Sequence, residues 1–142
     1  MKLLNKNNLF IIRGISGSGK STLANLLSSL VSNGKTVAAD DWFDIYTEGV
    51  WQFEKLGLAH EWCRNKTKEL LQEGHDVFVH NTFVKQAEIN IYIKIAQELD
   101  ISYHILIADG DYQNIHKVPD HKNTQRAKDF WFNNRFMRES HA

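Results

Sequence analysis

The chain has 142 residues, and its 17 basic side chains (Lys and Arg) balance 17 acidic ones. A net charge of zero excludes a strong overall attraction to polyanions, and the single cysteine, Cys63, excludes an internal disulfide. A chain of this length can bury one sizeable core, so we expect a single domain over residues 1–142. No stretch resembles a signal peptide or a membrane span, which predicts a cytoplasmic protein without a membrane partner.

The first predicted strand covers residues 9–12 and leads into a glycine-rich loop. Residues 14–21 read GISGSGKS, which matches the phosphate-loop pattern of two glycines with four free positions between them, followed by Lys and Ser or Thr. A helix-like run over residues 22–27 follows, so the motif has the strand-loop-helix context that it needs. An ordinary glycine-rich turn is the alternative, but spacing and context favour a site for nucleotide phosphates.

The residue types of this loop suit phosphate chemistry. Glycines permit positive φ angles, so that successive amides can converge on phosphate oxygens, and the helix N-terminus adds further amide donors. Lys20 supplies a positive charge for the β- and γ-phosphates, and the Ser21 hydroxyl suits Mg²⁺. We therefore predict ATP and Mg²⁺ as cofactors. The predicted nucleotide-binding residues are Gly14, Ile15, Ser16, Gly17, Ser18, Gly19, Lys20, Ser21 and Thr22.

After the loop, the pattern predicts a helix to Ser32 and a second strand over residues 35–39. Leucines at positions 23, 26, 27 and 30 recur at helical spacing, and residues 33–34 (Asn-Gly) suggest a left-handed stop. The strand ends on Asp40 and Asp41, at the sheet edge that should also carry the phosphate loop. Two adjacent aspartates also suit a loop or a helix cap, but the strand-end position favours a functional role for at least one.

A long amphipathic helix is predicted over residues 47–74, ending at Gly74. His60 and Cys63 lie on one face of it and could form half of a metal site. No companion cysteine-rich segment exists, so packing is the favoured interpretation for both side chains, and Cys63 is not a nucleophile candidate.

The third predicted strand covers residues 76–80 and ends on Asn81 and Thr82. Residues 89–99 fit either a half-buried strand or a helix, but two parallel strands need a crossover, which favours a helix. Residues 101–108 form the fourth predicted strand, followed by a turn over residues 109–111. Alternating strands and helices predict a parallel sheet with helices on both faces.

The segment over residues 112–136 mixes aromatic and basic side chains. Its aromatics predict a last helix packed on the sheet, and its basic groups, among them Lys117, Lys122 and Arg126, predict a lid over the phosphates at residues 116–126. Stacking of the bases of a single nucleic-acid strand is the alternative.

Several of these motifs together resemble the P-loop kinases that include the kinase domain of phage polynucleotide kinase and related small ATP-binding (AAA-type) proteins. They are the phosphate loop with Arg13 before it, the strand-end pair Asp40-Asp41, residues 58–60, Asn81-Thr82 and residues 116–119. The resemblance implies a three-layer α/β/α sandwich with about four parallel strands in the order 2-3-1-4.

The resemblance also implies an ATP-dependent kinase in which Asp40 acts on the acceptor hydroxyl and Arg126 meets the transferred phosphate. Lys20 completes the predicted catalytic set, and Ser21 and Asp41 are the predicted metal ligands. The acceptor stays open among a polynucleotide 5′-hydroxyl, a nucleoside and a small molecule. The other functions left open are an NTPase or nucleotide-gated interaction module without an acceptor, and a single-strand nucleic-acid binder.

Overall fold

The computed structural model describes residues 7–15 and 17–110. Its elements follow in the order β1 (Asn8–Arg13), α1 (Lys20–Ser29), β2 (Gly34–Val37), α2 (Asp40–Tyr46), the short 3-10 helix η2 (Phe53–Lys55), α3 (Leu56–Gln72), β3 (Asp76–Asn81), α4 (Gln86–Glu98) and β4 (Ser102–Ile107).

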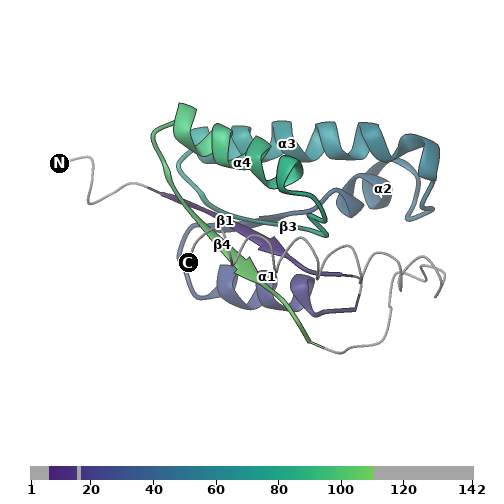
Figure 1. The fold of residues 1–142 in the computed structure, drawn as a ribbon, viewed down its shortest axis with the longest axis horizontal. Helices are drawn as coiled ribbons and strands as arrows, with labels where there is room; N and C mark the ends of the chain where they lie inside the picture. Colours follow the sequence, from purple (N-terminus) through teal and green to yellow (C-terminus); the bar gives the residue numbers. More distant parts are fainter. Residues whose placement is uncertain (1–6, 16, 111–142) are drawn as a thin grey trace.

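The strands form one parallel sheet in the order β2-β3-β1-β4. As Figure 1 shows, α1 covers one face of this sheet, and α3 and α4 cover the other, with α2 beside α3. This arrangement confirms the predicted three-layer α/β/α sandwich and its strand order.

β1 is apolar on both sides because helices cover both faces of the sheet. Leu9 and Ile11 belong to the larger core, which α3 and α4 complete, whereas Ile12 belongs to the smaller core on the α1 side. The ring of Phe10 stacks on that of Phe78 with centroids 4.5 Å apart. The two central strands are thereby fixed between two helical layers, and so is the edge at which both strands end.

The helix after the phosphate loop ends at Ser29, three residues earlier than predicted. The predicted left-handed stop is also wrong, because Gly34 has no positive φ angle and begins β2. A Cβ atom at Gly34 would lie 2.6 Å from the carbonyl oxygen of Ser28, so glycine is needed there for close packing. Two of the four leucines at helical spacing, Leu26 and Leu30, are exposed.

The single helix predicted over residues 47–74 is wrong in its first part. α2 has already ended at Tyr46; the chain then forms a turn and η2, and α3 begins only at Leu56. Glu48 and Gly49 have φ angles of 55° and 84°, which a right-handed helix cannot contain, so the chain turns there. The predicted end is confirmed, since Gly74 has φ 93° directly after the last turn of α3.

The ambiguous segment over residues 89–99 lies mostly in α4, which confirms the topological argument for a helix. Glu88 helps to begin this helix, because its Oε2 accepts a hydrogen bond of 3.1 Å from the backbone N–H of Lys85. The fourth predicted strand is confirmed as β4.

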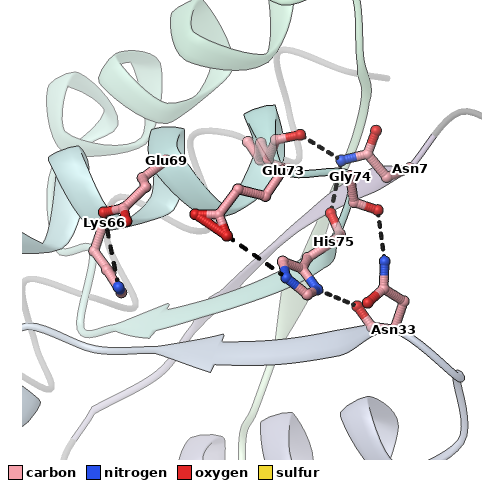
Figure 2. A network of polar contacts seen from close by, with 8 residues as sticks. Asn7, Asn33, Lys66, Glu69, Glu73, Gly74 and His75 are labelled. Carbon is pink, nitrogen blue, oxygen red and sulfur yellow. Dashed lines mark hydrogen bonds and ion pairs between the residues drawn. The ribbon is translucent and has the colours of Figure 1, made fainter.

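The amino ends of the strands are tied together by polar side chains, shown in Figure 2. Asn7 Nδ2 donates to the carbonyl oxygens of Leu71 (2.9 Å) and His75 (2.7 Å), and Asn33 Nδ2 donates to the carbonyl oxygen of Gly74 (2.8 Å). These bonds connect the end of α3 to the starts of β1 and β2, at the sheet edge opposite to the phosphate loop.

No helix among the described residues is long and apolar enough to cross a membrane. The predicted lid, the predicted last helix, Arg126 and Ser16 lie outside the described residues.

Candidate functional site

The phosphate loop is folded tightly against the end of β4. A Cβ atom at Gly14 would lie 2.7 Å from the carbonyl oxygen of Ala108, so a larger residue would push β1 and β4 apart. Gly17 and Gly19 have φ angles of 81° and 89°, the left-handed region that glycine enters without strain. The Ser18 carbonyl oxygen accepts a 3.0 Å hydrogen bond from the N–H of Gly110. The glycines of the motif are therefore required by the shape of the loop.

The N-terminus of α1 opens onto this loop. Gly19 is its N-cap, without a side-chain capping bond, and the first turn contains no acidic residue. The first amides of a helix lack partners within the helix, and its dipole places partial positive charge there, so this end suits an anion. Lys20 is only 7% exposed, and its Nζ donates to the carbonyl oxygen of Ile15 at 3.4 Å, which holds the ammonium group over the loop.

The hydroxyl of Ser21 lies 3.4 Å from Nδ1 of His80. His80 is buried near the end of β3, beside Ile12 of β1. Within the described residues, no group of three or more His, Cys, Asp or Glu side chains could hold a metal ion. Mg²⁺ fits such a site nonetheless, because it usually keeps several waters and binds through substrate phosphates and few protein oxygens.

Asp40 and Asp41 form the first turn of α2, at the carboxyl edge of β2. Oδ2 of Asp41 accepts a 2.9 Å hydrogen bond from the backbone N–H of Ala38, so this carboxylate stabilises the start of the helix. Burial raises the pKa of Asp41; the Ala38 hydrogen bond opposes this shift, while the charges of Asp44 and Asp40 add to it. No side chain caps α2, so the helix-cap alternative that the sequence left open is not observed; Asp41 instead holds the backbone N–H of Ala38, just before the helix.

Asn81, the last residue of β3, connects this turn to α3. Its Oδ1 accepts a 2.8 Å hydrogen bond from the backbone N–H of Ala39, which directly precedes Asp40. Its Nδ2 lies 3.5 Å from Sγ of Cys63 in the buried part of α3. The Asn81 side chain therefore positions the first turn of α2, which contains Asp40 and Asp41 and is called the aspartate turn below.

Arg13, directly before the loop, is fully buried. Its Nη2 donates to the carbonyl oxygen of Phe83 at 2.7 Å and to that of Val84 at 3.4 Å. Burial lowers the pKa of Arg13, and the negative charge of Glu88 opposes this shift. Phe83 has a φ angle of 51°, so the guanidinium group braces the β3–α4 loop where its backbone is strained.

One cavity of about 550 Å³ joins these parts. Lys20 and Ser21 line its nucleotide end, and the aspartate turn, α3 and the β3–α4 loop line the rest. The polar and charged side chains around it are Lys20, Ser21, Asn25, Thr36, Asp40, Asp41, Asp44, His60, Arg64, His80, Asn81, Thr82, Glu88 and Tyr92.

Of the predicted site residues, Lys20, Ser21, Asp40 and Asp41 line this cavity. The other described residues of the predicted nucleotide site do not line it, and Thr22 is exposed. Cys63 is buried beside Asn81, whereas His60 lines the cavity. The sequence interpretation missed His80 and Arg64. The spacing of Arg64, four residues after His60, could have indicated the latter, since both then share one helix face.

The parallel sheet, the phosphate loop and the uncapped helix behind it define a P-loop α/β domain of the kinase-like type. A family model described as "AAA domain" matches residues 9–134, and the chain belongs to this family.

Human NEDD4-binding protein 2 is 31% identical to the chain over 136 residues, which cover 86% of the chain. The chain spans only 8% of the length of that protein.

Solved structures share the fold. A chain of the Pnkp1/Rnl/Hen1 RNA repair complex matches with a TM-score of 0.71 and 15% identity, covering 92% of this chain and 46% of that chain. The APS kinase CysC of Mycobacterium tuberculosis, in complex with AMPPNP and APS, matches with a TM-score of 0.56 and 17% identity, covering 85% and 68%. At these identities the likeness establishes the fold alone.

Proposed function

We propose that this domain, taken as one unit over residues 1–142, is a phosphotransferase that moves the γ-phosphoryl group of Mg-ATP to a hydroxyl group. The observation that carries the proposal is a continuous cavity of about 550 Å³ that joins Lys20 and Ser21 to Asp40. An enzyme that only hydrolyses a nucleotide requires the phosphate loop and a water molecule. It does not require a second group of polar side chains across the cavity from the loop. The family and the fold shared with an AMPPNP-bound APS kinase support the nucleotide part.

Each residue of the site has a role in this reaction. The loop amides and Lys20 hold the phosphates and balance their charge, and Ser21 would hold Mg²⁺, which supplies further charge stabilisation when bound. Asp40 orients the acceptor and accepts its proton. The hydroxyl oxygen bonds to the γ-phosphorus while the bond to the β–γ bridging oxygen breaks, and ADP leaves with that electron pair. Arg126, assigned from the resemblance, would meet the transferred phosphoryl group, and Asp41 would contact Mg²⁺ through water.

The proposal is tested by incubating the protein with γ-labelled ATP, Mg²⁺ and a panel of 5′-hydroxyl oligonucleotides, nucleosides and sugars. Label should appear on one acceptor class. Lys20→Ala should weaken ATP binding or turnover severely. Asp40→Asn should lower transfer by about 100-fold or more and leave ATP affinity within a few-fold. Asp44→Asn, which changes another carboxylate of α2 that lines the cavity, is the matched control and should retain most of the transfer.

Release of labelled inorganic phosphate at the same rate with and without every acceptor would contradict the proposal and indicate an NTPase. Retained transfer in Asp40→Asn together with its loss in Asp41→Asn would exchange the roles of the two aspartates.

A further inference from the structure

A group of large apolar side chains lies on the outer face of α2 and on the turn that follows it. Trp42, Ile45 and Tyr46 occupy positions i, i+3 and i+4 of the helix and therefore share one face. Ile45, Tyr46, Val50 and Trp51 are between 46% and 60% exposed. These five residues are called the α2 patch below, and none of them lines the cavity. Apolar side chains gathered in this way are typical of an interaction surface.

The rings of the α2 patch are held in place by one buried side chain. The ring centroid of Trp42 lies 5.3 Å from that of Tyr46 and 5.2 Å from that of Phe43, and the centroid of Trp51 lies 6.2 Å from that of Phe43. Phe43 is buried in the larger core. It therefore connects the helix part of the patch to the turn part, at separations where aromatic rings attract one another.

The turn between the two parts of the patch is held by hydrogen bonds. The backbone N–H of Gly49 donates to the carbonyl oxygen of Phe43 at 2.8 Å, and Oγ1 of Thr47 donates to the carbonyl oxygen of Val50 at 2.7 Å. These bonds hold Glu48 at a φ angle of 55°, which residues other than glycine rarely adopt. The patch is therefore preorganised, which lowers the entropy that a partner loses on binding.

The charge around the α2 patch is negative. Residues 40–63, which include the first two turns of α3, contain six carboxylates against one lysine, Lys55, and one histidine, although the chain as a whole is neutral. Asp44, Glu48 and Glu54 are exposed, and none of the three forms an ion pair within the described part of the chain. A partner that covers the apolar side chains and supplies positive charge would match both properties.

We propose that the α2 patch binds a basic amphipathic helix of a partner protein. The apolar face of that helix covers the patch, and its Lys or Arg side chains lie beside the carboxylates. Other occupants fit less well, because these carboxylates repel the phosphates of nucleic acids and anionic lipid headgroups. A symmetric contact between two copies would also bring like charges together. The inference concerns a surface outside the cavity and does not depend on the proposed reaction.

Three synthetic peptides of about 18 residues, a length that favours helix formation, test the chemistry of the partner. The first has Leu at steps of three and four residues with Lys beside them, the second has Glu in place of every Lys, and the third has the first composition in scrambled order. We expect the first peptide to bind in calorimetry and the others to bind at least about tenfold more weakly, because one lacks the complementary charge and the other lacks the apolar face. Added salt should weaken the binding.

Substitutions in the α2 patch locate the binding. Ile45→Ser and Tyr46→Ser remove exposed side chains and should leave the fold intact, which thermal unfolding checks. Each should weaken binding of the basic peptide by about tenfold, since a few apolar anchors dominate most interfaces. Leu30→Ser is the matched control, because Leu30 is an exposed apolar residue at the end of α1, on the other face of the sheet (Figure 1). Its affinity for the peptide should equal that of wild type.

Substitution of carboxylates tests the contribution of charge. Glu48→Gln combined with Glu54→Gln should weaken peptide binding by about threefold or more, whereas Glu98→Gln, at the end of α4, should not change it. Mg-AMPPNP should not displace the peptide. Equal binding of the basic and acidic peptides, unchanged binding in both patch variants, or displacement by Mg-AMPPNP would overturn the inference. Oligonucleotide binding or dimerisation that Tyr46→Ser abolishes would also overturn it and assign the patch to nucleic acid or to a second copy.

Discussion

At the scale of single residues, Asn81 connects two parts of the site that lie far apart in the sequence. Its side chain links the backbone before Asp40 to Cys63 of α3, with bonds of 2.8 Å and 3.5 Å. An aspartate at this position could accept the first bond but could not donate the second, and its charge would lie in a buried place. The amide group of Asn81 can both accept the first bond and donate the second without a buried charge, and we assign Asn81 a positioning role.

We predict that Asn81→Ala will affect both stability and catalysis. Removing the acceptor leaves the buried N–H of Ala39 unpaired, which costs about 1–3 kcal/mol. Thermal unfolding should show the loss. The value of kcat for transfer should fall by about tenfold or more, with ATP affinity within a few-fold, because the aspartate turn loses its support. Asn90→Ala, which removes an exposed side-chain bond on α4, is the control. A normal kcat in Asn81→Ala would reduce the role to stability alone.

At the scale of elements, sequence patterns predicted what is local or topologically required. The strand-loop-helix unit was predictable because one continuous segment forms it, and α4 was predictable because parallel strands need a crossover. The helix predicted over residues 47–74 was wrong because apolar spacing continues through a turn in which Glu48 and Gly49 have positive φ angles.

The cavity wall was less predictable than the loop. Arg13 and Phe83 are 70 residues apart, and the position of Arg64 at the cavity depends on how α3 crosses the sheet. Such contacts follow from packing between elements, which periodicity does not describe.

The start of α2 gives a prediction on pH. Burial is the main cause that raises the pKa of Asp41, so protonation of this carboxyl favours the folded state. Its contribution to the free energy of unfolding is present below the unfolded pKa of about 3.9 and is lost as pH rises through the higher folded pKa. Asp41→Asn cannot ionise but can still accept the bond from Ala38. In Mg²⁺-free buffer it should unfold about 2 °C higher than wild type at pH 7.

The difference in melting temperature between Asp41→Asn and wild type should grow as pH rises from about 4, the unfolded pKa, through the higher folded pKa of Asp41. Glu54→Gln removes one exposed carboxylate from η2 and controls for the change in net charge. A difference that stays constant with pH, or that Glu54→Gln reproduces, would contradict the assignment to Asp41.

At the scale of the whole molecule, the carboxyl edge and the amino edge of the sheet carry different groups of residues. The carboxyl edge holds the phosphate loop, the aspartate turn and the cavity between them. The amino edge holds the polar network of Asn7, Asn33 and His75, which Figure 2 shows closing the end of α3 onto the strands. Nothing in that network lines the cavity. Stability and ligand binding should therefore respond separately to mutations at the two edges.

Asn7→Ala tests this separation. Its Nδ2 group donates to the carbonyl oxygens of Leu71 and His75, and removing it leaves both partly buried acceptors without this donor. We expect a loss of about 1–2 kcal/mol, which for a domain of this size lowers the melting temperature by roughly 4–8 °C. At temperatures where the variant is folded, its ATP affinity and its kcat should equal those of wild type, because Asn7 shares no bonding partner with the residues that line the cavity, and distant sites without shared partners act independently. Lys20→Ala should show the opposite pattern, with lost nucleotide binding and a melting temperature close to wild type in the absence of ATP. A reduced ATP affinity in Asn7→Ala at low temperature would show that the two edges are coupled through the sheet.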